Sequence, residues 1–354
     1  MKICYFGDYN PEYARNRIII KGLKQNHVEV LECNERSVGF KKYWRLRQGL
    51  KKINGQYDIL LVGYSDNRWL PIWAKLINKK PVVWDAFYSK YDVLVFDRKL
   101  VKNKGLKSFY HWLVEWLACW AADIILLDTN CYIDYFIKTF KVDKGKFIRV
   151  LIGADEAIFY PLSGKASKEE FLVHFHGKFI PVQGIQYIIQ AAKTLEKYED
   201  VKFQLIGGGQ TYDQMLKLAK ELSSKNIFFL GYQPFEKLNS YLQEADISLG
   251  NFGDTDKATR VIATKSYETI AAGRPLISAD APAMREIFEN RKNVLFCQRA
   301  NPKDLANKIL ELKNNRELRN EIAQGGYQLY KQIAEPKIIG KKFLEDISAL
   351  QIKN

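Results

Sequence analysis

The sequence predicts an α/β protein made of two doubly wound, Rossmann-like units. Short apolar runs alternate with longer amphipathic stretches along the chain, which is the pattern of a parallel sheet covered by helices. The alternation occurs twice, and the polar stretch Pro161–Ser167, which contains Pro and Gly, predicts a linker between the two series. The length of 354 residues allows two or three domains with separate cores. Ligands of such sheets bind at the carboxyl ends of the strands, so we expect the two units to face a cleft that holds the site.

Each series contains six apolar runs that predict strands, rich in Val, Ile, Leu or Phe and short enough for a buried strand. In the first series they are Lys2–Phe6, Glu29–Glu32, Ile59–Val62, Val82–Trp84, Ile124–Leu127 and Ile148–Leu151, with helices such as Arg15–Lys24, Leu70–Ile77 and Tyr132–Phe140 between them. In the second series they are Phe171–Phe175, Lys202–Ile206, Ile227–Leu230, Ile247–Leu249, Pro275–Ser278 and Val294–Phe296. Amphipathic spacing predicts the helices of this series at Ile185–Lys197, Gln214–Glu221, Glu236–Glu244, Ser266–Ala272, Ala283–Glu289 and Pro302–Asn314.

The chain carries an excess of positive charge, with 55 Lys+Arg against 40 Asp+Glu. Residues 1–160 hold 27 Lys+Arg and 17 Asp+Glu, so a net +10 of the total +15 lies there. The strongest cluster is the stretch Lys41–Lys52, where aromatic and basic residues alternate at helical spacing. This stretch has two interpretations: it forms an ordinary solvated helix face, or it forms a surface that binds a polyanion or an anionic membrane. The hydrophobic content of 47% excludes a disordered or collagen-like chain.

Cysteine usage and hydropathy predict a cytoplasmic protein. The five cysteines are scattered without a paired C-x-x-C spacing, which predicts neither a disulfide framework nor a zinc site. The first residues form a short apolar run that turns polar at once, which predicts a buried strand rather than a signal peptide. The longest apolar candidate, Phe109–Ala122, is too short to span a bilayer, and we expect a packed helix or, as the alternative, an interfacial membrane helix.

Glycine-rich turns after the predicted strands of the second series suit an anionic ligand. Gly177 and Gly184 bracket Lys178 between a strand and a helix, where backbone N–H groups and an ammonium can approach a phosphate. Gly207 and Gly209 follow the next strand and Tyr232 the one after, where a flat nucleoside base could lie against the backbone; plain turn formation explains each of these glycines equally well.

The stretch from Thr255 to Pro275 is the most informative part of the sequence. If Thr264 caps a helix, the free N–H groups of Lys265 and Ser266 form an anion site. Glu268 lies one turn further along the same face, where its carboxylate can accept hydrogen bonds from a ribose diol.

Residues from about 150 to 315 resemble the nucleotide-binding half of the family 4 (group 1) glycosyltransferases of GT-B architecture. Four ordered segments carry the resemblance: Ile152–Pro161 to the interdomain N-G-V-D-x-x-x-F-x-P signature, Gly177–Gly184 to G-R-x-x-x-x-K-G, Leu205–Gly209 to L-x-G-x-G, and Lys265–Pro275 to the donor-binding E-A-x-A-x-G-x-P helix. The closing segment Tyr330–Leu350 resembles the helix that returns to the first domain. The resemblance implies an acceptor-binding domain at 1–158, a nucleotide-sugar domain at 159–334 and a returning helix at 335–354.

The sequence departs from this family at two positions of the donor site. Gln183 stands where the family commonly has Lys on the diphosphate, and Arg260 stands where its E-x7-E motif has the first Glu. Lys265 is a candidate to replace the missing cation, and Arg260 to bind a phosphate or an acidic sugar. On the acceptor side the resemblance assigns Gly7 to the diphosphate loop and Asp85 to the acceptor, for which a structural carboxylate is the alternative. Arg15 and Arg17 could reach the same cleft, but we expect both at the surface.

The resemblance implies a retaining transfer of a sugar from a nucleoside diphosphate sugar to an acceptor hydroxyl, with a glycan or lipid-linked glycan as acceptor. Lys178, Lys265 and Gly7 would stabilise the departing diphosphate, and Glu268 would hold the donor. We expect no metal ion and no cofactor besides the donor substrate. The alternatives are a non-catalytic GT-B homologue that binds sugar nucleotide for a partner, and a basic nucleic-acid-binding protein, which the donor motifs disfavour. The stretch Lys41–Lys52 would suit the inner face of an anionic membrane.

Overall fold

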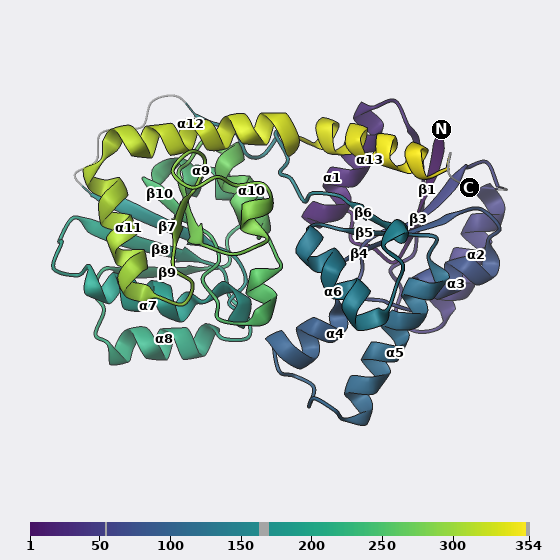
Figure 1. Ribbon diagram of the computed structural model, residues 1–354, viewed down its shortest axis with the longest axis horizontal. Coiled ribbons are helices and arrows are strands. Elements are labelled where there is room, and N and C mark those ends of the chain that lie inside the picture. Colours follow the sequence, from purple (N-terminus) through teal and green to yellow (C-terminus); the bar gives the residue numbers. More distant parts are fainter. Residues whose placement is uncertain (54, 163–169, 352–354) are drawn as a thin grey trace. The chain divides into compact units, whose positions relative to one another are not determined.

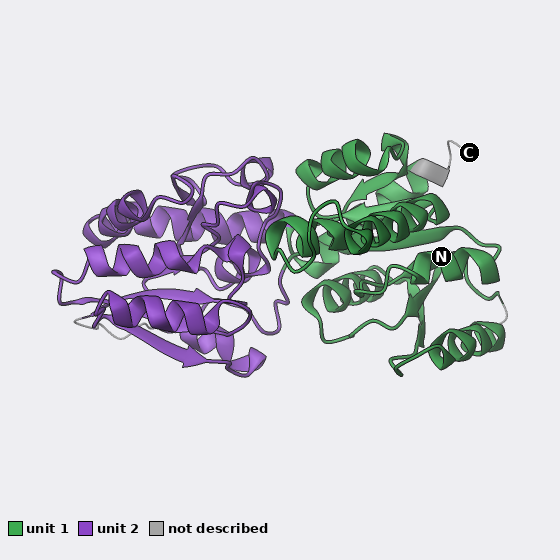
Figure 2. Cartoon of the chain, turned by 90° about the horizontal axis from the view of Figure 1, so that it is seen from below, with its two compact units in different colours: residues 1–153, 334–354 green, residues 154–333 purple. Residues whose placement is uncertain are grey.

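The computed structural model describes residues 1–53, 55–162 and 170–351, and the chain folds into two compact units. Unit 1 comprises residues 1–153 and 334–354, and unit 2 comprises residues 154–333 (Figures 1 and 2). The first unit thus ends a few residues before the boundary at 158 that the sequence implied. Residues 163–167 of the predicted linker lie outside the described residues.

The sheet of unit 1 has six parallel strands in the order β2-β1-β3-β4-β5-β6. Its strands are β1 (Lys2–Gly7), β2 (Glu29–Asn34), β3 (Ile59–Val62), β4 (Val82–Phe87), β5 (Ile124–Leu127) and β6 (Phe147–Arg149). Its helices are α1 (Ala14–Gln25), α2 (Lys41–Ile53), α3 (Leu70–Ile77), α4 (Lys90–Asp92), α5 (Leu106–Ala121), α6 (Asn130–Phe140) and α13 (Pro336–Gln351), with a π-helical segment at Val93–Asp97 and a short 3₁₀ turn at Lys144–Lys146. The central strands β3 and β4 are buried along their whole length, because helices cover both faces of the sheet.

Helix α13 closes unit 1 by packing against α1 (Figure 1). Gly22 of α1 and Gly340 of α13 face each other, and a Cβ built on Gly340 would lie 2.4 Å from the backbone of Gly22. The two helix backbones can approach this closely only because neither position carries a side chain. Ile339, Phe343 and Ile347 of α13 join the core formed by α1 and the sheet.

The sheet of unit 2 also has six parallel strands, in the order β12-β11-β10-β7-β8-β9. Its strands are β7 (Phe171–His176), β8 (Val201–Ile206), β9 (Ile227–Gly231), β10 (Ile247–Leu249), β11 (Leu276–Ala279) and β12 (Leu295–Cys297). Its helices are α7 (Ile185–Thr194), α8 (Tyr212–Glu221), α9 (Leu238–Glu244), α10 (Thr264–Ala271), α11 (Pro302–Asn314) and α12 (Arg316–Ile333). Aliphatic and aromatic side chains of β7, β8, α7 and α11 form the largest part of its core.

All twelve predicted strands are present, and the doubly wound fold class is confirmed. The predicted helix Ala283–Glu289 is wrong, because the segment contains only the 3₁₀ turn Met284–Glu286. The side chain of Asn293 accepts a hydrogen bond from the backbone N–H of Glu289 at 2.8 Å, so a local side-chain contact replaces a helical one.

Candidate active site

Three glycines bring the backbone segments after β7 and β8 into close contact in unit 2. Gly177 and Gly207 have φ values of +146° and +126°, which favour glycine. A Cβ on Gly207 would lie 1.9 Å from the carbonyl oxygen of Gly177, and a Cβ on Gly209 2.9 Å from that of Phe179. These turns therefore need glycine for the backbone geometry itself, and they leave a surface without side chains at the carboxyl end of the sheet.

Helix α10 begins beside this surface at Thr264, and Ala263 is the N-cap residue. The prediction that Thr264 caps the helix is wrong, because Thr264 already has helical geometry and no side chain caps this end. The first backbone N–H groups of a helix carry partial positive charge and attract anions. The N–H of Ser266 already donates to the carbonyl oxygen of Ala263 at 2.9 Å, so the expectation that this group is free is wrong. The hydroxyl oxygen of Ser266, in the same turn, is buried and has no hydrogen-bond partner among the described residues.

Lys265 places its ammonium group next to the Gly177 turn. Its Nζ lies 3.3 Å from the position of a Cβ on Gly177, 3.8 Å from the centre of the Phe175 ring, and donates a hydrogen bond to Oε1 of Gln183. The side chain is buried, and this burial lowers the pKa of Lys265 well below its ordinary value, with the charge of Glu268 opposing the shift. An anion beside Nζ would restore the favourable interaction that the ammonium loses on burial.

Two histidines of β7 form a chain of hydrogen bonds that ends at Glu268. Oε2 of Glu268 lies 2.8 Å from Nε2 of His176, and Nδ1 of His176 lies 2.9 Å from Nε2 of His174. Burial lowers the pKa of His174 well below 6.5, so its ring is neutral at neutral pH. The tautomer in which each Nε2–H donates satisfies both hydrogen bonds, and it directs a donor at Glu268. This contact leaves the second carboxylate oxygen of Glu268 for a ligand.

The other predicted donor residues are less buried. Lys178 is exposed on the Gly177 turn, and Arg260 is half-buried after the 3₁₀ turn Asp256–Thr259. The exposed ring of Tyr232 lies over Gly208, where a Cβ would approach it to 2.8 Å. The structure therefore brings Gly177, Gln183 and Lys265 into contact, and it places Glu268 one turn behind them on α10.

Asp85, at the carboxyl half of β4 in unit 1, forms a buried ion pair. Arg15 donates from Nε and Nη2 to both carboxylate oxygens at 2.9–3.1 Å, and both side chains are 0% exposed. The expected surface position of Arg15 is wrong, because its guanidinium also donates to the carbonyl oxygens of Val150 and Leu151. Burial raises the pKa of Asp85, and the charge of Arg15 opposes this shift. With every oxygen enclosed, Asp85 cannot reach a bound acceptor, and we assign it a structural role.

Two further residues of the site were not assigned from the sequence. His174 and His176 alternate along β7, so both side chains lie on one face of the strand, and this spacing was the available signal.

Gly7 ends β1 in unit 1 with φ +138°, and its Cβ position lies 3.2 Å from Leu70. Among the described residues no group of three or more His, Cys, Asp or Glu side chains is placed to hold a metal ion.

Comparison with known proteins relates unit 2 to one family. Residues 161–329 match the model of the family "Glycosyl transferases group 1". An uncharacterized glycosyltransferase of Methanocaldococcus jannaschii, MJ1178, is 28% identical over 176 residues, which are 49% of this chain and 48% of that protein. The match thus spans about half the length of this relative. The group 1 part of the sequence resemblance is supported, and the assignment to family 4 stays a prediction.

Solved structures of the same architecture cover the whole chain. The crystal structure of Anabaena Alr3699/HepE in complex with UDP-glucose has a TM-score of 0.72 at 16% identity, over 99% of this chain and 100% of that one. A sucrose-phosphate synthase from Thermosynechococcus elongatus has a TM-score of 0.78 at 12% identity, over 100% of both chains. These likenesses confirm the predicted fold of two Rossmann-like units.

Proposed function

We propose that this protein is a glycosyltransferase that moves a sugar from a nucleoside diphosphate sugar to the hydroxyl of an acceptor. The observation that carries the proposal is the buried ammonium of Lys265 at the first turn of α10, beside Gly177 and the unpartnered hydroxyl of Ser266. These groups form a buried site whose hydrogen-bond donors can stabilise a departing diphosphate, and the diphosphate in turn favours the charged form of Lys265. The family match of residues 161–329 and the UDP-glucose bound by the Anabaena protein support a sugar nucleotide as the donor.

The proposed transfer retains the configuration of the sugar, as the resemblance to family 4 implies, and its acceptor is a glycan or a lipid-linked glycan. The bond between the anomeric carbon and the diphosphate oxygen breaks, a bond to the acceptor oxygen forms, and the proton of the acceptor hydroxyl passes to the departing diphosphate. Lys265, Lys178 and the dipole of α10 offset the charge of the leaving diphosphate, so we propose that neither a metal ion nor another cofactor takes part. Glu268, held by His176, binds the ribose diol.

Thermal-shift measurements with UDP-, GDP-, ADP- and dTDP-sugars test the donor site. A donor present at a concentration of roughly 100 times its Kd adds about 2.7 kcal/mol to the free energy of unfolding. We therefore expect a clear rise in Tm with at least one of these sugar nucleotides. Glu268→Gln is expected to weaken that donor about 10- to 100-fold, because the hydrogen bonds of a charged group are worth about 1.5–3 kcal/mol. Glu221→Gln, at an exposed position of α8, is the matched control. Equal donor affinity of Glu268→Gln and wild type would contradict the ribose role.

Turnover assays separate the proposed function from its two alternatives. A non-catalytic homologue would bind a sugar nucleotide tightly without hydrolysing or transferring it. A nucleic-acid-binding protein, with the basic residues 1–160 along a phosphate backbone, would show affinity that falls steeply with salt and no turnover of sugar nucleotides. Either result would refute the transferase.

We also propose that unit 1 associates with the anionic inner face of a membrane, through α5 as well as through α2. The outward face of α5 is apolar: Leu106, Phe109, Trp116 and Trp120 are all exposed, Leu106 to 90% and Trp120 to 72%. The polar and small residues Ser108, Glu115 and Ala118 lie on its buried face instead. The expectation of a packed helix therefore holds for one face only, and the exposed face has the character of an interfacial helix.

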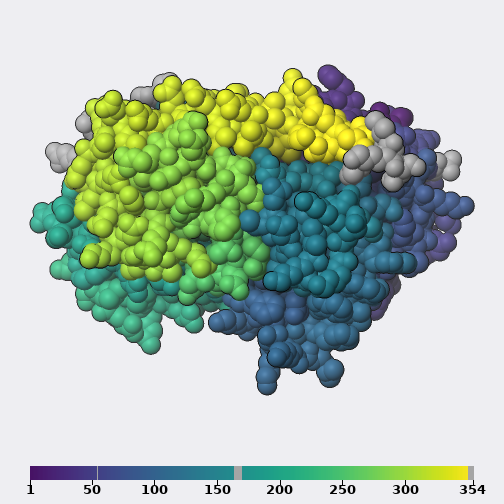
Figure 3. Space-filling view, viewed as in Figure 1, coloured from purple at the N-terminus to yellow at the C-terminus, as the bar shows by residue number. Residues whose placement is uncertain are grey.

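Charge around the start of α5 complements this apolar face. Residues 98–114 contain five Lys or Arg and no Asp or Glu, and the chain there projects from the surface (blue in Figure 3). On α2, Trp44 and the basic side chains of Arg45, Arg47, Lys51 and Lys52 are exposed as well. No helix among the described residues is long and apolar enough to cross a membrane.

Sedimentation with vesicles tests the membrane proposal. We expect the protein to sediment with vesicles of phosphatidylglycerol and phosphatidylcholine at low salt, and to remain in the supernatant with pure phosphatidylcholine, since each basic residue near an anionic surface contributes about 1 kcal/mol. Leu106→Ser with Trp120→Ser is expected to lower binding, and Phe228→Ser, at an exposed ring of β9 in unit 2, is the control. Equal sedimentation of all variants, or none with anionic vesicles, would refute the role of α5.

A further inference from the structure

A pocket of about 500 Å³ lies at the carboxyl end of the sheet of unit 1. Asp8 follows β1, Asn67 and Trp69 follow β3, and Lys90 follows β4, while α2 and α5 complete the wall. Parallel sheets bind ligands at this edge, and the volume is within the range of small-molecule sites. None of the residues assigned to the donor lines this pocket, so the pocket is separate from the proposed donor residues.

Two aromatic rings form one side of the pocket. The indole N–H of Trp69 donates to the hydroxyl of Tyr110 at 3.0 Å, which holds the two side chains next to each other. Both remain open to solvent, with 42% of Trp69 and 49% of Tyr110 exposed. Because the polar group of the indole is already satisfied, its ring face is available for stacking. A pyranose presents an apolar face of C–H groups that can stack on such a ring.

Hydrogen-bond donors and acceptors line the same pocket. Oδ2 of Asp8 accepts from Nζ of Lys42 at 2.5 Å and from Nδ2 of Asn67 at 3.0 Å. Oδ1 of Asp8 is buried and has no hydrogen-bond partner among the described residues. A sugar hydroxyl donates and accepts at once, so neighbouring hydroxyls match a carboxylate flanked by an ammonium and an amide.

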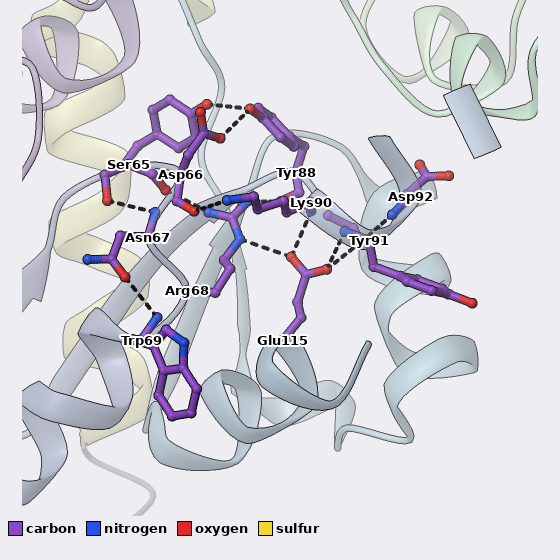
Figure 4. A network of polar contacts seen from close by, with 12 residues as sticks. Ser65, Asp66, Asn67, Arg68, Trp69, Tyr88, Lys90, Tyr91, Asp92 and Glu115 are labelled. Atoms are coloured by element: carbon purple, nitrogen blue, oxygen red, sulfur yellow. Dashed lines mark hydrogen bonds and ion pairs between the residues drawn. The ribbon is translucent and has the colours of Figure 1, made fainter. Parts of the chain in front are cut away.

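A buried ion pair fixes the wall of the pocket (Figure 4). Glu115, on the buried face of α5, points toward the segments after β3 and β4 and accepts from Nε of Arg68 at 3.0 Å. The same carboxylate accepts from the backbone N–H groups of Lys90 at 2.9 Å and Tyr91 at 3.0 Å. Arg68 in turn donates to the carbonyl oxygens of Ser65 and Tyr88, each at 2.7 Å. The loops that carry Asn67 and Trp69 are thus held in place before a ligand binds, which lowers the entropy cost of binding.

The charges of the lining favour a neutral ligand over an anion. The ammonium of Lys42 is paired with Asp8 and the guanidinium of Arg68 with Glu115. Nζ of Lys90 donates to the carbonyl oxygen of Asp66 at 2.8 Å, and burial lowers the pKa of this lysine. We propose that the pocket binds an uncharged pyranose, stacked on Trp69 and hydrogen-bonded to Asp8 and Asn67, as the acceptor sugar; this rests on the proposed function.

Saturation-transfer NMR on the full-length protein, with methyl glycosides of glucose, galactose, mannose and N-acetylglucosamine, tests the pocket directly. We expect at least one glycoside to bind with an affinity that salt leaves unchanged, since no ion pair forms. Trp69→Leu is expected to weaken that glycoside about tenfold, because it removes the aromatic face, and Trp69→Phe to restore part of the loss. Phe228→Leu, at the exposed ring in unit 2, should bind like the wild type.

Binding of no glycoside, or displacement of the bound glycoside by inorganic pyrophosphate, would overturn the proposal. Unchanged affinity in Trp69→Leu, with its Tm equal to that of the wild type, would do the same. Turnover of sugar nucleotides is measured separately. Glycoside binding without turnover would refute the transferase activity but not the sugar-binding pocket. Donor hydrolysis without glycoside binding would refute only the sugar-binding pocket.

Discussion

Lys265→Met is expected to lower kcat for sugar transfer about 100- to 1,000-fold, the usual loss when one group that stabilises developing negative charge is removed. Methionine keeps most of the volume and the apolar packing of the lysine stem against Phe175, so unit 2 should stay folded. The measurement is steady-state transfer or hydrolysis of the sugar nucleotide that gives the largest thermal shift. The affinity of the Lys265→Met variant for the nucleoside diphosphate product should fall as well.

Lys178→Met is the matched control for this prediction. Lys178 lies on the adjacent turn but is exposed, and a solvated ammonium contributes about 0–1 kcal/mol to an ion pair. We therefore expect a loss of less than about tenfold, measured in the same assay. Equal losses in the two variants would contradict the special role of the buried ammonium.

The pH dependence of donor binding follows from the same burial. In the free protein the pKa of Lys265 lies well below 10.5 because the ammonium is desolvated. A diphosphate beside Nζ favours the charged form and raises the pKa of Lys265 in the complex. Binding therefore takes up a proton at pH values between the lowered pKa of the free protein and the raised pKa of the complex, and the affinity falls as pH rises through this window. Calorimetry in buffers of different ionisation enthalpy measures the uptake, which Lys265→Met should abolish.

Asp85→Ala is expected to destabilise unit 1 by about 3–5 kcal/mol, because it leaves the guanidinium of Arg15 buried and unpaired. For a unit of this size such a loss lowers Tm by roughly 10 °C, which calorimetry or circular dichroism detects. Replacing both partners, in Arg15→Met with Asp85→Leu, should recover much of the stability, since no buried charge then lacks a partner.

The exposed ion pair Lys2–Glu29 of the same sheet supplies the control, and Glu29→Gln is expected to change the free energy of unfolding by less than about 1 kcal/mol. This pair of measurements separates the structural role of Asp85 from a catalytic one. If Asp85→Ala kept the wild-type Tm and lost only transfer, the carboxylate would act on the acceptor instead.

The sequence alone determined the fold class, because the hydrophobic period of a strand or a helix is a local property. Ile59–Val62 is apolar at every position and Ile247–Leu249 at both ends, with Ser248 between them, and both became central strands with the bounds that the sequence predicted. The helix that carries Lys265 and Ser266 was also predicted, two residues short of its observed start at Thr264. The segment Ala283–Glu289 was mispredicted because the competing contact with Asn293 is not part of any helical period.

Only the tertiary structure decided which charged side chains are enclosed and which remain accessible. Asp85 ends the apolar run of β4 and has the chemistry of a base, but Arg15, far away in sequence, encloses it completely. The outward apolar face of α5 and the contact between Trp69 and Tyr110 also depend on how helices pack against the sheet. Burial and pairing between residues far apart in the sequence are properties of the whole fold. They decide how strongly each charged side chain is desolvated and which partner it has, and a local sequence pattern holds neither piece of information.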